Sequence, residues 1–459
     1  MTGGWGALAA RLDGALILPG DLGMAANNKQ FASALPLSEP QALLRCSSPA
    51  DVQRGVAHAV EHDLAVTIRS GGHCFGDLSC GTGLVLDVSG MNAVRPEGER
   101  VVLGPGALAG DTAEALAAHD RAIATGGCPL VAMGGLALAG GFGFLGRRDG
   151  LTSDQIDAFE VVLADGRIVV ADADSEPDLF WALRGGGALG FGVVTRLVAR
   201  TQELAPLVVV IGRWSLDEAA ALIADWQHWS PNADPAINLE LGLIGSDFLE
   251  DPPFVELFGI VAGTQDEAAP HLAALSRRLG RLADRLDVWQ VTRAEAARYC
   301  SGLLGHRLKP AWLPSRPYGA PGLQATRSHF FEEPLGRAAV EQCVRNVADD
   351  RLYSQYRELE FVPWGAAYQQ GGGAFAHRDA HMLIRHTATV GVRSDENLRA
   401  HARAWTEASF AALDAHSDSR AYQGYAEPRR TGWHAACYGP ALPRLLDLKQ
   451  RYDPAGLFA

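Results

Sequence analysis

Long apolar runs and clusters of basic residues are both missing from this sequence. No segment reaches the ~18 consecutive apolar residues that a membrane-spanning helix requires, and residues 1–21 lack a basic region ahead of a continuous apolar stretch. The 40 Lys and Arg residues are outnumbered by 53 Asp and Glu residues, which gives a net charge of −13. Nucleic acid and anionic membranes attract clustered positive charge. We therefore expect neither as a partner, and we expect a cytoplasmic protein.

Cysteine is scarce as well. The seven cysteines form an odd and scattered set without the paired spacing of a metal site, which argues against a secreted disulfide framework and against a bound metal. Internal repeats and low-complexity tracts are also lacking, and 47% of the residues are hydrophobic while 20% are charged, as in globular proteins. A length of 459 residues predicts roughly two or three folding units of ~150 residues each.

The order of predicted elements favours a mixed α+β fold. Residues 40–70 are typical of a strand, a helix and a second strand, because the middle portion begins with helix-capping residues and keeps its apolar residues on one face. Residues 159–172 predict two strands joined by a hairpin at Asp165-Gly166. From about residue 200 longer helices alternate with strands, and residues 441–459 predict a helix that Asp453-Pro454 ends.

Glycine is abundant, with 52 residues in 459 and an excess between Gly71 and Gly192. The paired glycines of RSGGH, residues 69–73, follow a predicted strand, where backbone N–H groups can face an anion such as a pyrophosphate. Such pairs are also found in ordinary turns. Two further glycine-rich segments begin at Gly126 and Arg184, and three loops of this kind can surround one long cofactor. A Rossmann site is disfavoured, because no G-x-G-x-x-G opens a strand–helix unit with an acidic residue ~20 positions later.

The sequence resembles the FAD-linked oxidases of the vanillyl-alcohol oxidase superfamily. The resemblance is carried by RSGGH, by GGCP at residues 126–129 and by residues 420–459. It is most similar to the berberine-bridge-enzyme-like branch, which includes sugar oxidases and antibiotic-tailoring oxidases of secondary metabolism. The resemblance implies an α+β fold with a two-part PCMH-type FAD-binding domain and an α+β substrate domain with an antiparallel sheet. We expect the FAD-binding domain at 1–200, the substrate-binding domain at 201–415, and a C-terminal segment at 416–459 that returns to the FAD domain.

The resemblance also implies a covalently attached cofactor. In the family, the histidine of the RSGGH-like motif and the cysteine of a G-x-C motif are both bonded to the flavin, and here these positions are His73 and Cys128. A neutral imidazole or a thiolate can attack an electrophilic flavin once both are held in place. Cys74 and Cys80 do not match a linking position and are interpreted as packing residues. The other expected FAD-binding residues are Arg69, Ser70, Gly71, Gly72, Ser79, Gly127, Val131, Gly134, Gly135, Gly140, Gly141, Gly143, Gly192, Val193 and Tyr438.

The catalytic residues are expected near the C-terminus. Oxidation of an alcohol needs a base for the hydroxyl proton, and Tyr425 matches the place of the family's tyrosine. Where relatives carry Tyr, Glu or Gln on a strand of the substrate cavity, this sequence has Arg385 and His386. Alternation along the strand directs only one of the two toward the flavin, and we consider His386 as a second catalytic residue or as a structural histidine. Gly424 replaces the family's asparagine, so substrate contacts are expected to be unusual.

The predicted function is an FAD-dependent oxidase that transfers a hydride from an alcohol, a sugar or a secondary-metabolite intermediate to flavin N5, with oxygen as the acceptor. The resemblance places Val131 over the flavin face, where a small side chain favours access of oxygen, although any valine can equally be a core residue. A dehydrogenase or oxidative cyclase is the first alternative. A flavin-holding binding protein without catalysis is the second.

Overall fold

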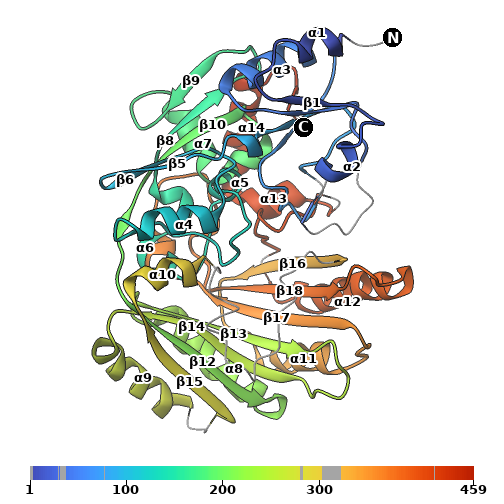
Figure 1. Cartoon of the computed structure of the whole chain (residues 1–459). Helices are drawn as coiled ribbons and strands as arrows, with labels where there is room; N and C mark the ends of the chain where they lie inside the picture. Colours follow the sequence, from blue (N-terminus) through green and yellow to red (C-terminus); the bar gives the residue numbers. More distant parts are fainter. Residues whose placement is uncertain are drawn as a thin grey trace.

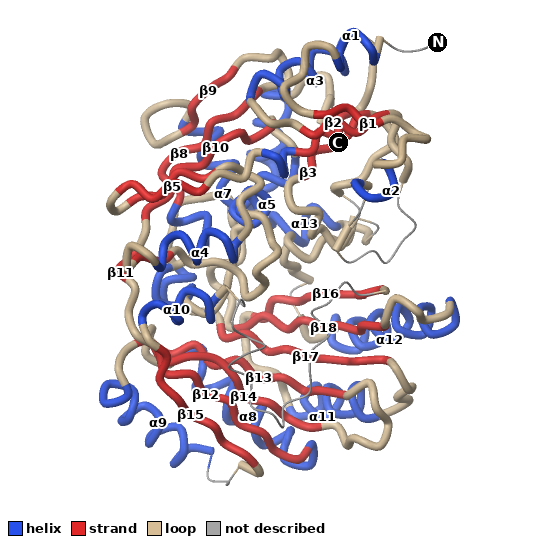
Figure 2. The backbone as a smooth tube through the Cα atoms, viewed as in Figure 1, coloured by secondary structure: helices blue, strands red, loops and turns tan. Residues whose placement is uncertain are grey.

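The computed structural model contains two groups of elements stacked on one another, with a seven-stranded sheet in the lower group and smaller sheets in the upper one (Figure 1). It describes residues 4–28, 30–31, 38–76, 78–279, 283–301, 322–417, 419–428 and 430–458. Helices and strands are mixed in both groups (Figure 2), which confirms the predicted α+β fold. No helix within these ranges combines the length and the hydropathy needed to cross a membrane.

The first small sheet carries the strand from which the RSGGH loop extends. Its order is β1 (Ala15–Ile17), β2 (Ala42–Arg45), β4 (Leu84–Asp87) and β3 (Val66–Arg69), with β1 antiparallel and the others parallel. Helix α3 (Pro49–Glu61) begins where Ser48 accepts a hydrogen bond from Asp51 N, and its apolar residues pack in the core with β2 and β4. The strand–helix–strand unit predicted for residues 40–70 is confirmed. Two short helices, α1 (Trp5–Ala9) and α2 (Met24–Asn27), precede β2 in the chain.

The second small sheet is antiparallel throughout, in the order β5 (Val94–Glu97), β6 (Arg100–Leu103), β10 (Val193–Arg200), β8 (Ile156–Val162) and β9 (Ile168–Ala171). The predicted hairpin between β8 and β9 is confirmed, with Gly166 at a φ of +81°. The helices of this region are α4 (Ala109–Ala117), α5 (Met133–Leu138), α6 (Gly146–Asp149) and α7 (Pro177–Gly186), and β7 (Arg121–Ala122) pairs with β11 (Gln202–Glu203). Two glycine-rich segments therefore lead into α5 and out of α7.

The large sheet is antiparallel and has helices along one face. Its order is β15 (Arg285–Val291), β12 (Leu207–Ser215), β14 (Phe254–Ala262), β13 (Ile237–Gly245), β17 (Gln355–Pro363), β18 (Met382–Val390) and β16 (Leu323–Phe331). Helices α8 (Ala219–Trp229), α9 (Gln265–Leu279), α11 (Arg337–Ala348) and α12 (Glu396–Asp414) pack on that face (Figure 2), while α10 (Arg293–Cys300) contacts α4. Residues of a strand alternate between faces. Because Leu239 and Leu241 join the core under these helices, Glu240 faces the upper group.

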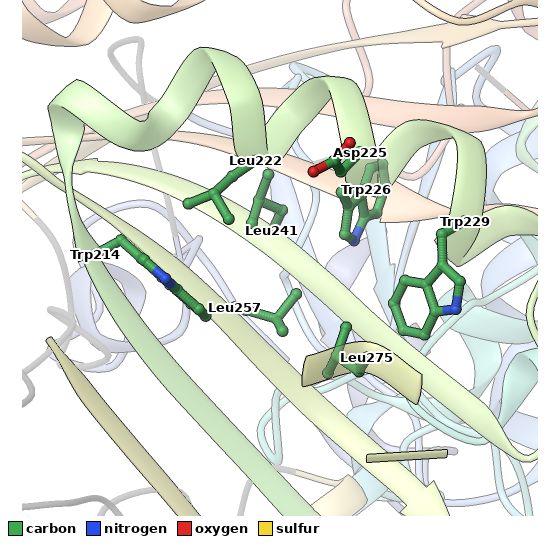
Figure 3. Close-up of a pocket in the computed structure, with 8 residues that line it drawn as sticks. All are labelled: Trp214, Leu222, Asp225, Trp226, Trp229, Leu241, Leu257 and Leu275. Carbon is green, nitrogen blue, oxygen red and sulfur yellow. The ribbon is translucent and has the colours of Figure 1, made fainter. Parts of the chain in front are cut away.

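A small apolar crevice lies between α8, α9 and this sheet (Figure 3). Its lining consists of Trp214, Leu222, Asp225, Trp226, Trp229, Leu241, Leu257 and Leu275. Its volume of about 10 Å³ has room for roughly one water molecule. We therefore interpret it as a packing gap in the core of the lower group.

The C-terminal residues pack against the upper group. Helices α13 (Trp433–Tyr438) and α14 (Leu442–Tyr452) place Tyr438 and Leu445 in the same core as β8 and β10. Beyond α14, Phe458 forms a parallel bridge to Val66 of β3, and Lys449 Nζ donates to Gly190 O at 2.7 Å. On these contacts we propose the division expected from the sequence, with a first domain at 1–200, a second at 201–415 and a returning segment at 416–459.

Candidate active site

A large cavity lies between the two groups and has a volume of about 450 Å³. One side, which we call the glycine wall, is formed by lining residues of segments 70–79, 126–144 and 187–192. The opposite side, the sheet wall, is formed by lining residues of the large sheet. Residues 422–426 of the C-terminal segment also line the cavity. All three predicted glycine-rich segments therefore reach one site.

The first two loops of the glycine wall are held against each other. Ser70 Oγ and the backbone N–H of Gly134 both donate to Pro105 O, at 2.5 and 2.9 Å. A Cβ atom at Gly71 would lie 2.8 Å from the Cβ atom of Ala132, which is closer than side chains approach. A larger residue at position 71 would separate the loop that carries His73 from the loop that carries Cys128.

His73 lines the cavity as a neutral imidazole. Its ring stacks on Phe31, with 4.0 Å between the ring centroids and 18° between the planes. Its Nε2 atom is buried and has no hydrogen-bond partner among the residues that the structure describes. Burial lowers the pKa of His73 to about 4, because the charged form loses its hydration. The imidazole is therefore uncharged at neutral pH, and its Nε2 atom makes no hydrogen bond to a described residue.

Cys128 lines the same cavity and forms no disulfide. Burial raises the pKa of its thiol, and the backbone N–H groups of Leu130 and Val131 offset only part of that effect. The thiol is therefore protonated at neutral pH, and any reaction at its sulfur would require loss of this proton, because the thiolate is the nucleophile.

The lining includes most of the residues expected to bind the cofactor. Val131, Gly134 and Gly135 follow Cys128 on the glycine wall, and Gly192 ends it. The residues brought together here are Ser70, Gly71, Gly72, His73, Ser79, Gly127, Cys128, Val131, Gly134, Gly135, Gly143 and Gly192. Cys74, interpreted from the sequence as a packing residue, also lines the cavity.

Five expected cofactor residues lie outside this lining. The Arg69 guanidinium is buried in an ion pair with Asp87, at 2.8 Å, and holds the ends of β3 and β4 together. Val193 and Tyr438 are buried in hydrophobic cores. Gly140 and Gly141 have φ angles of +101° and +77°, a region in which glycine is favoured. These two glycines therefore serve the turn before α6, and they do not face the cavity.

The sheet wall carries charged side chains at alternate strand positions. Glu360 of β17 lies opposite Arg385 of β18, and Glu358 lies opposite Thr387. All four line the cavity, as does Glu240 of β13. The Arg385 guanidinium forms ion pairs with Glu360 and, at 3.6 Å, with Glu358. In contrast to the glycine wall, this wall is built from side chains.

Tyr425 lies between the two walls. Its ring contacts Phe75 and Phe142 edge-on, at centroid distances of 5.5 and 6.2 Å. Arg385 Nη1 donates to its hydroxyl oxygen at 3.4 Å. Burial raises the pKa of Tyr425 to about 12, whereas the Arg385 charge acts in the opposite direction. The phenol is therefore placed in the cavity next to a cation that favours its ionised form.

The structure does not bring His386 into the cavity. Its side chain is fully buried on the opposite face of β18, where Nδ1 forms a 2.9 Å hydrogen bond with Ser409 Oγ of α12. Burial holds the pKa of His386 well below its usual value. Strand alternation instead directs Arg385 into the cavity. Of the two readings that the sequence left open for His386, its surroundings favour a structural role.

Sequence reasoning missed Glu240, Glu358 and Glu360. The signal was present, because Glu358 and Glu360 alternate with Leu359 and Phe361. Such alternation is typical of a strand with one face in solvent, so it did not point to a cavity. Only the packing of two groups over this face reveals the site.

Comparison with known proteins agrees with this architecture. Residues 40–172 match the family model described as an FAD binding domain, and residues 421–459 match the model described as berberine and berberine like. The chain is 30% identical over 325 residues to (R)-6-hydroxynicotine oxidase of Paenarthrobacter nicotinovorans, covering 64% of this chain and 70% of that protein. It is 27% identical over 457 residues to the xylooligosaccharide oxidase of Thermothelomyces thermophilus, covering 93% and 87%.

A solved structure supports the same fold. The wild-type BBE-like 1 protein of Physcomitrella patens superposes with a TM-score of 0.85 over 99% of this chain and 97% of that chain, at 22% identity. The fold, the glycine wall and the relatives define an FAD-dependent oxidoreductase. The chain belongs to the berberine-bridge-enzyme-like family of FAD-linked oxidoreductases.

The residues of the cavity fit FAD. The closely packed glycine loops leave backbone groups facing a long cavity without Cβ atoms, as the approach of a dinucleotide requires. His73 lines the same cavity, and its buried Nε2 atom has no hydrogen-bond partner among the described residues. When FAD is bound, the glycine wall would hold it, and the sheet wall would face the substrate.

Proposed function

We propose that this protein is an oxidase that carries FAD covalently through His73 and Cys128 and oxidises an alcohol, a sugar or a secondary-metabolite intermediate. The observation that carries the proposal is that His73, Cys128 and Tyr425 open onto one cavity. The attachment residues come from the glycine wall, whereas the proposed base lies against the cation of the sheet wall.

Tyr425 is proposed as the base. When bound, FAD would be held by the glycine wall and would supply a hydride acceptor that oxygen reoxidises, so that the hydride and the proton of the substrate hydroxyl together end up in hydrogen peroxide. The substrate hydroxyl gives its proton to the Tyr425 phenolate, and a carbonyl group forms as the neighbouring carbon loses hydride. Arg385 stabilises the phenolate through the contact with the phenol oxygen. Glu360 orients Arg385 through their ion pair.

Val131 is proposed to admit oxygen. It is half-buried, lines the cavity three residues after Cys128, and begins the turn that enters α5. A valine leaves more space than a larger side chain at the same place. This supports an oxidase over the alternative of a dehydrogenase or oxidative cyclase.

The relatives suggest the range of substrates. Curated relatives include oxidases of (R)-6-hydroxynicotine, xylooligosaccharide, chitooligosaccharide and glucooligosaccharide. Because a fold does not fix a substrate, we propose a small organic molecule together with oxygen.

The experiment is anaerobic titration of the purified yellow protein with oligosaccharides, secondary alcohols and alkaloid-type amines. Bleaching of the flavin absorbance by at least one class, followed by recovery and peroxide release when air is admitted, is the expected result. Bleaching without peroxide release would favour a dehydrogenase or cyclase. No bleaching by any class would favour a binding protein that has lost catalysis.

A further inference from the structure

Buried acidic side chains are concentrated on the sheet wall. Glu240, Glu358 and Glu360 all line the cavity, yet the exposed fractions of these three residues are only 6%, 3% and 5%. Burying a carboxylate is costly unless charges and hydrogen bonds compensate it. Three such residues occupy cavity-facing positions of two neighbouring strands, and buried ionisable groups in a cavity are candidates for a functional role.

The sheet wall carries more negatively charged than positively charged side chains. Among the described lining residues, these three carboxylates face one guanidinium, that of Arg385. Arg385 is engaged by Glu360, by the Tyr425 hydroxyl and, at the longer distance of 3.6 Å, by Glu358. A carboxylate has two oxygens and about four acceptor positions, so a carboxylate that already has a partner can accept a further donor. The wall is thus built to receive hydrogen-bond donors, and most strongly those with positive charge.

The position of the proposed base leads to the same conclusion. Glu240 and Glu360 act on Tyr425 in the direction that raises its pKa and opposes the effect of Arg385. Two carboxylates beside a phenol hinder its ionisation. A cation that arrives with the substrate would reduce this effect when the base is needed.

A bound metal ion is a poorer explanation of these carboxylates. Within the described residues, no group of three or more His, Cys, Asp or Glu side chains is arranged to hold a metal ion. A neutral polyol could donate hydrogen bonds to these carboxylates, but it would not compensate their negative charge. An anionic substrate would be repelled by the same groups.

We propose that the substrate carries a protonated amine, which binds against Glu240 and Glu358 while Glu360 holds Arg385. This rests on the proposed function, because the amine occupies the same cavity as the carbon that is oxidised. The amine gives the enzyme a means of choosing a basic molecule over a sugar or an acid of equal size.

The test uses three probes that share one benzylic alcohol and differ in charge. They are 2-amino-1-phenylethanol, which is cationic at neutral pH, neutral 1-phenylethane-1,2-diol and anionic mandelate. Binding to the flavin-loaded enzyme is followed under anaerobic conditions by perturbation of the flavin spectrum and by thermal shift, so it is measured even where no oxidation occurs. We expect the amino alcohol to bind at least about tenfold more tightly than the diol, and mandelate to bind most weakly.

Two variants locate the effect. Glu240→Gln and Glu358→Gln keep the side-chain shape and remove the charge, so each should lower affinity for the amino alcohol by about tenfold and affinity for the diol by less than about threefold. Glu341→Gln is the matched control, because Glu341 lies on α11 in a surface pair with Arg337. It should leave the order of the three probes unchanged.

Each outcome has a defined meaning. Equal binding of the amino alcohol and the diol by the unmodified enzyme, no binding of the amino alcohol, or an unchanged preference in both glutamine variants would overturn the proposal. If a variant fails to fold, the order of the probes on the unmodified enzyme still decides. Loss of the proposed oxidase function would appear separately, as flavin that no compound bleaches, whereas the order of binding would remain measurable by thermal shift.

Discussion

The glycine wall and the sheet wall differ in how they are built. The glycine wall approaches the cavity with backbone and small side chains, and its shape depends on contacts such as that between Gly71 and Ala132. The sheet wall presents Glu240, Glu358 and Arg385 from three strands of one antiparallel sheet. The two sides of one cavity therefore differ in kind: one presents mainly backbone and small side chains, and the other presents charged side chains.

Because the two walls differ in construction, we expect substitutions in them to affect different properties of the protein. A change on the glycine wall should affect folding and attachment of the flavin. A change at Tyr425 or on the sheet wall should leave the flavin attached and affect its reduction by substrate. The following predictions test that separation, from the largest expected effect to the smallest.

The largest effect is expected for Tyr425→Phe, which removes the phenol oxygen and retains the ring. Loss of a general base commonly lowers a rate by ~10²–10⁴, so flavin reduction by substrate should fall by this factor while the flavin stays attached. Stopped-flow absorbance under anaerobic conditions measures the step. Tyr422→Phe is the control, because the Tyr422 hydroxyl accepts a hydrogen bond from Gly141 N at 3.1 Å. Its loss should lower the free energy of unfolding by about 1 kcal/mol and should leave the rate of flavin reduction nearly unchanged. Reduction at the original rate in the Tyr425 variant would place the base elsewhere.

The second effect concerns pH. Burial raises the pKa of Tyr425 to about 12, so only a small fraction is ionised at neutral pH. At pH values well below this pKa, the fraction of Tyr425 present as phenolate rises tenfold for each unit of pH. The phenolate is the form that acts as the base. The rate of flavin reduction at low substrate concentration should therefore increase by about 10² between pH 7 and pH 9. A rate that is flat over this interval would show that Tyr425 is not the base whose ionisation limits reduction.

The third effect is structural and belongs to the glycine wall. Gly71→Ala would place a Cβ atom 2.8 Å from Ala132 Cβ and 2.9 Å from its backbone nitrogen. Overpacking of this kind typically costs ~1–3 kcal/mol, which chemical denaturation should detect together with a lower proportion of attached flavin. Gly391→Ala is the matched control, because a Cβ atom there meets nothing within 4 Å and Gly391 lies outside the cavity lining. Equal stability of the two variants would contradict the close approach of the two loops.

The smallest effect is expected for Val131→Ile. One added methylene group near the flavin should slow reoxidation by oxygen several-fold and leave reduction by substrate nearly unchanged, with a change in stability of about 1 kcal/mol. Separate stopped-flow measurements of the two half-reactions provide the comparison. Equal slowing of both would remove Val131 from a role in oxygen access.

The sequence predicted the glycine wall better than the sheet wall for a physical reason. Motifs such as RSGGH act through local backbone geometry, so consecutive residues carry the information, and His73 and Cys128 could be named before the fold was known. The carboxylates of β13 and β17 become neighbours only when strands more than 100 residues apart pair in register. Arg385 and His386 illustrate the limit, because alternation showed that one of them faces the cavity but not which one.

Some of the expected cofactor residues lie outside the cavity lining for a similar reason. Arg69 lies in the motif, but its side chain turns to Asp87 on the neighbouring strand. Gly141 lies in a glycine-rich segment, but a Cβ atom there would lie 2.4 Å from Thr152 Oγ1. A motif therefore identifies the loop, whereas the packing around the loop determines which of its residues face the cofactor.

The central claim is that the glycine wall holds FAD through two covalent bonds. Its most direct test is the intact mass of the purified protein, together with acid precipitation of the unmodified chain, of the variants H73A and C128A, and of the double variant. We predict a mass that exceeds the chain by one FAD, a yellow pellet from the unmodified protein and from each single variant, and free flavin in the supernatant only from the double variant. Free flavin released from the unmodified protein by acid would contradict the account.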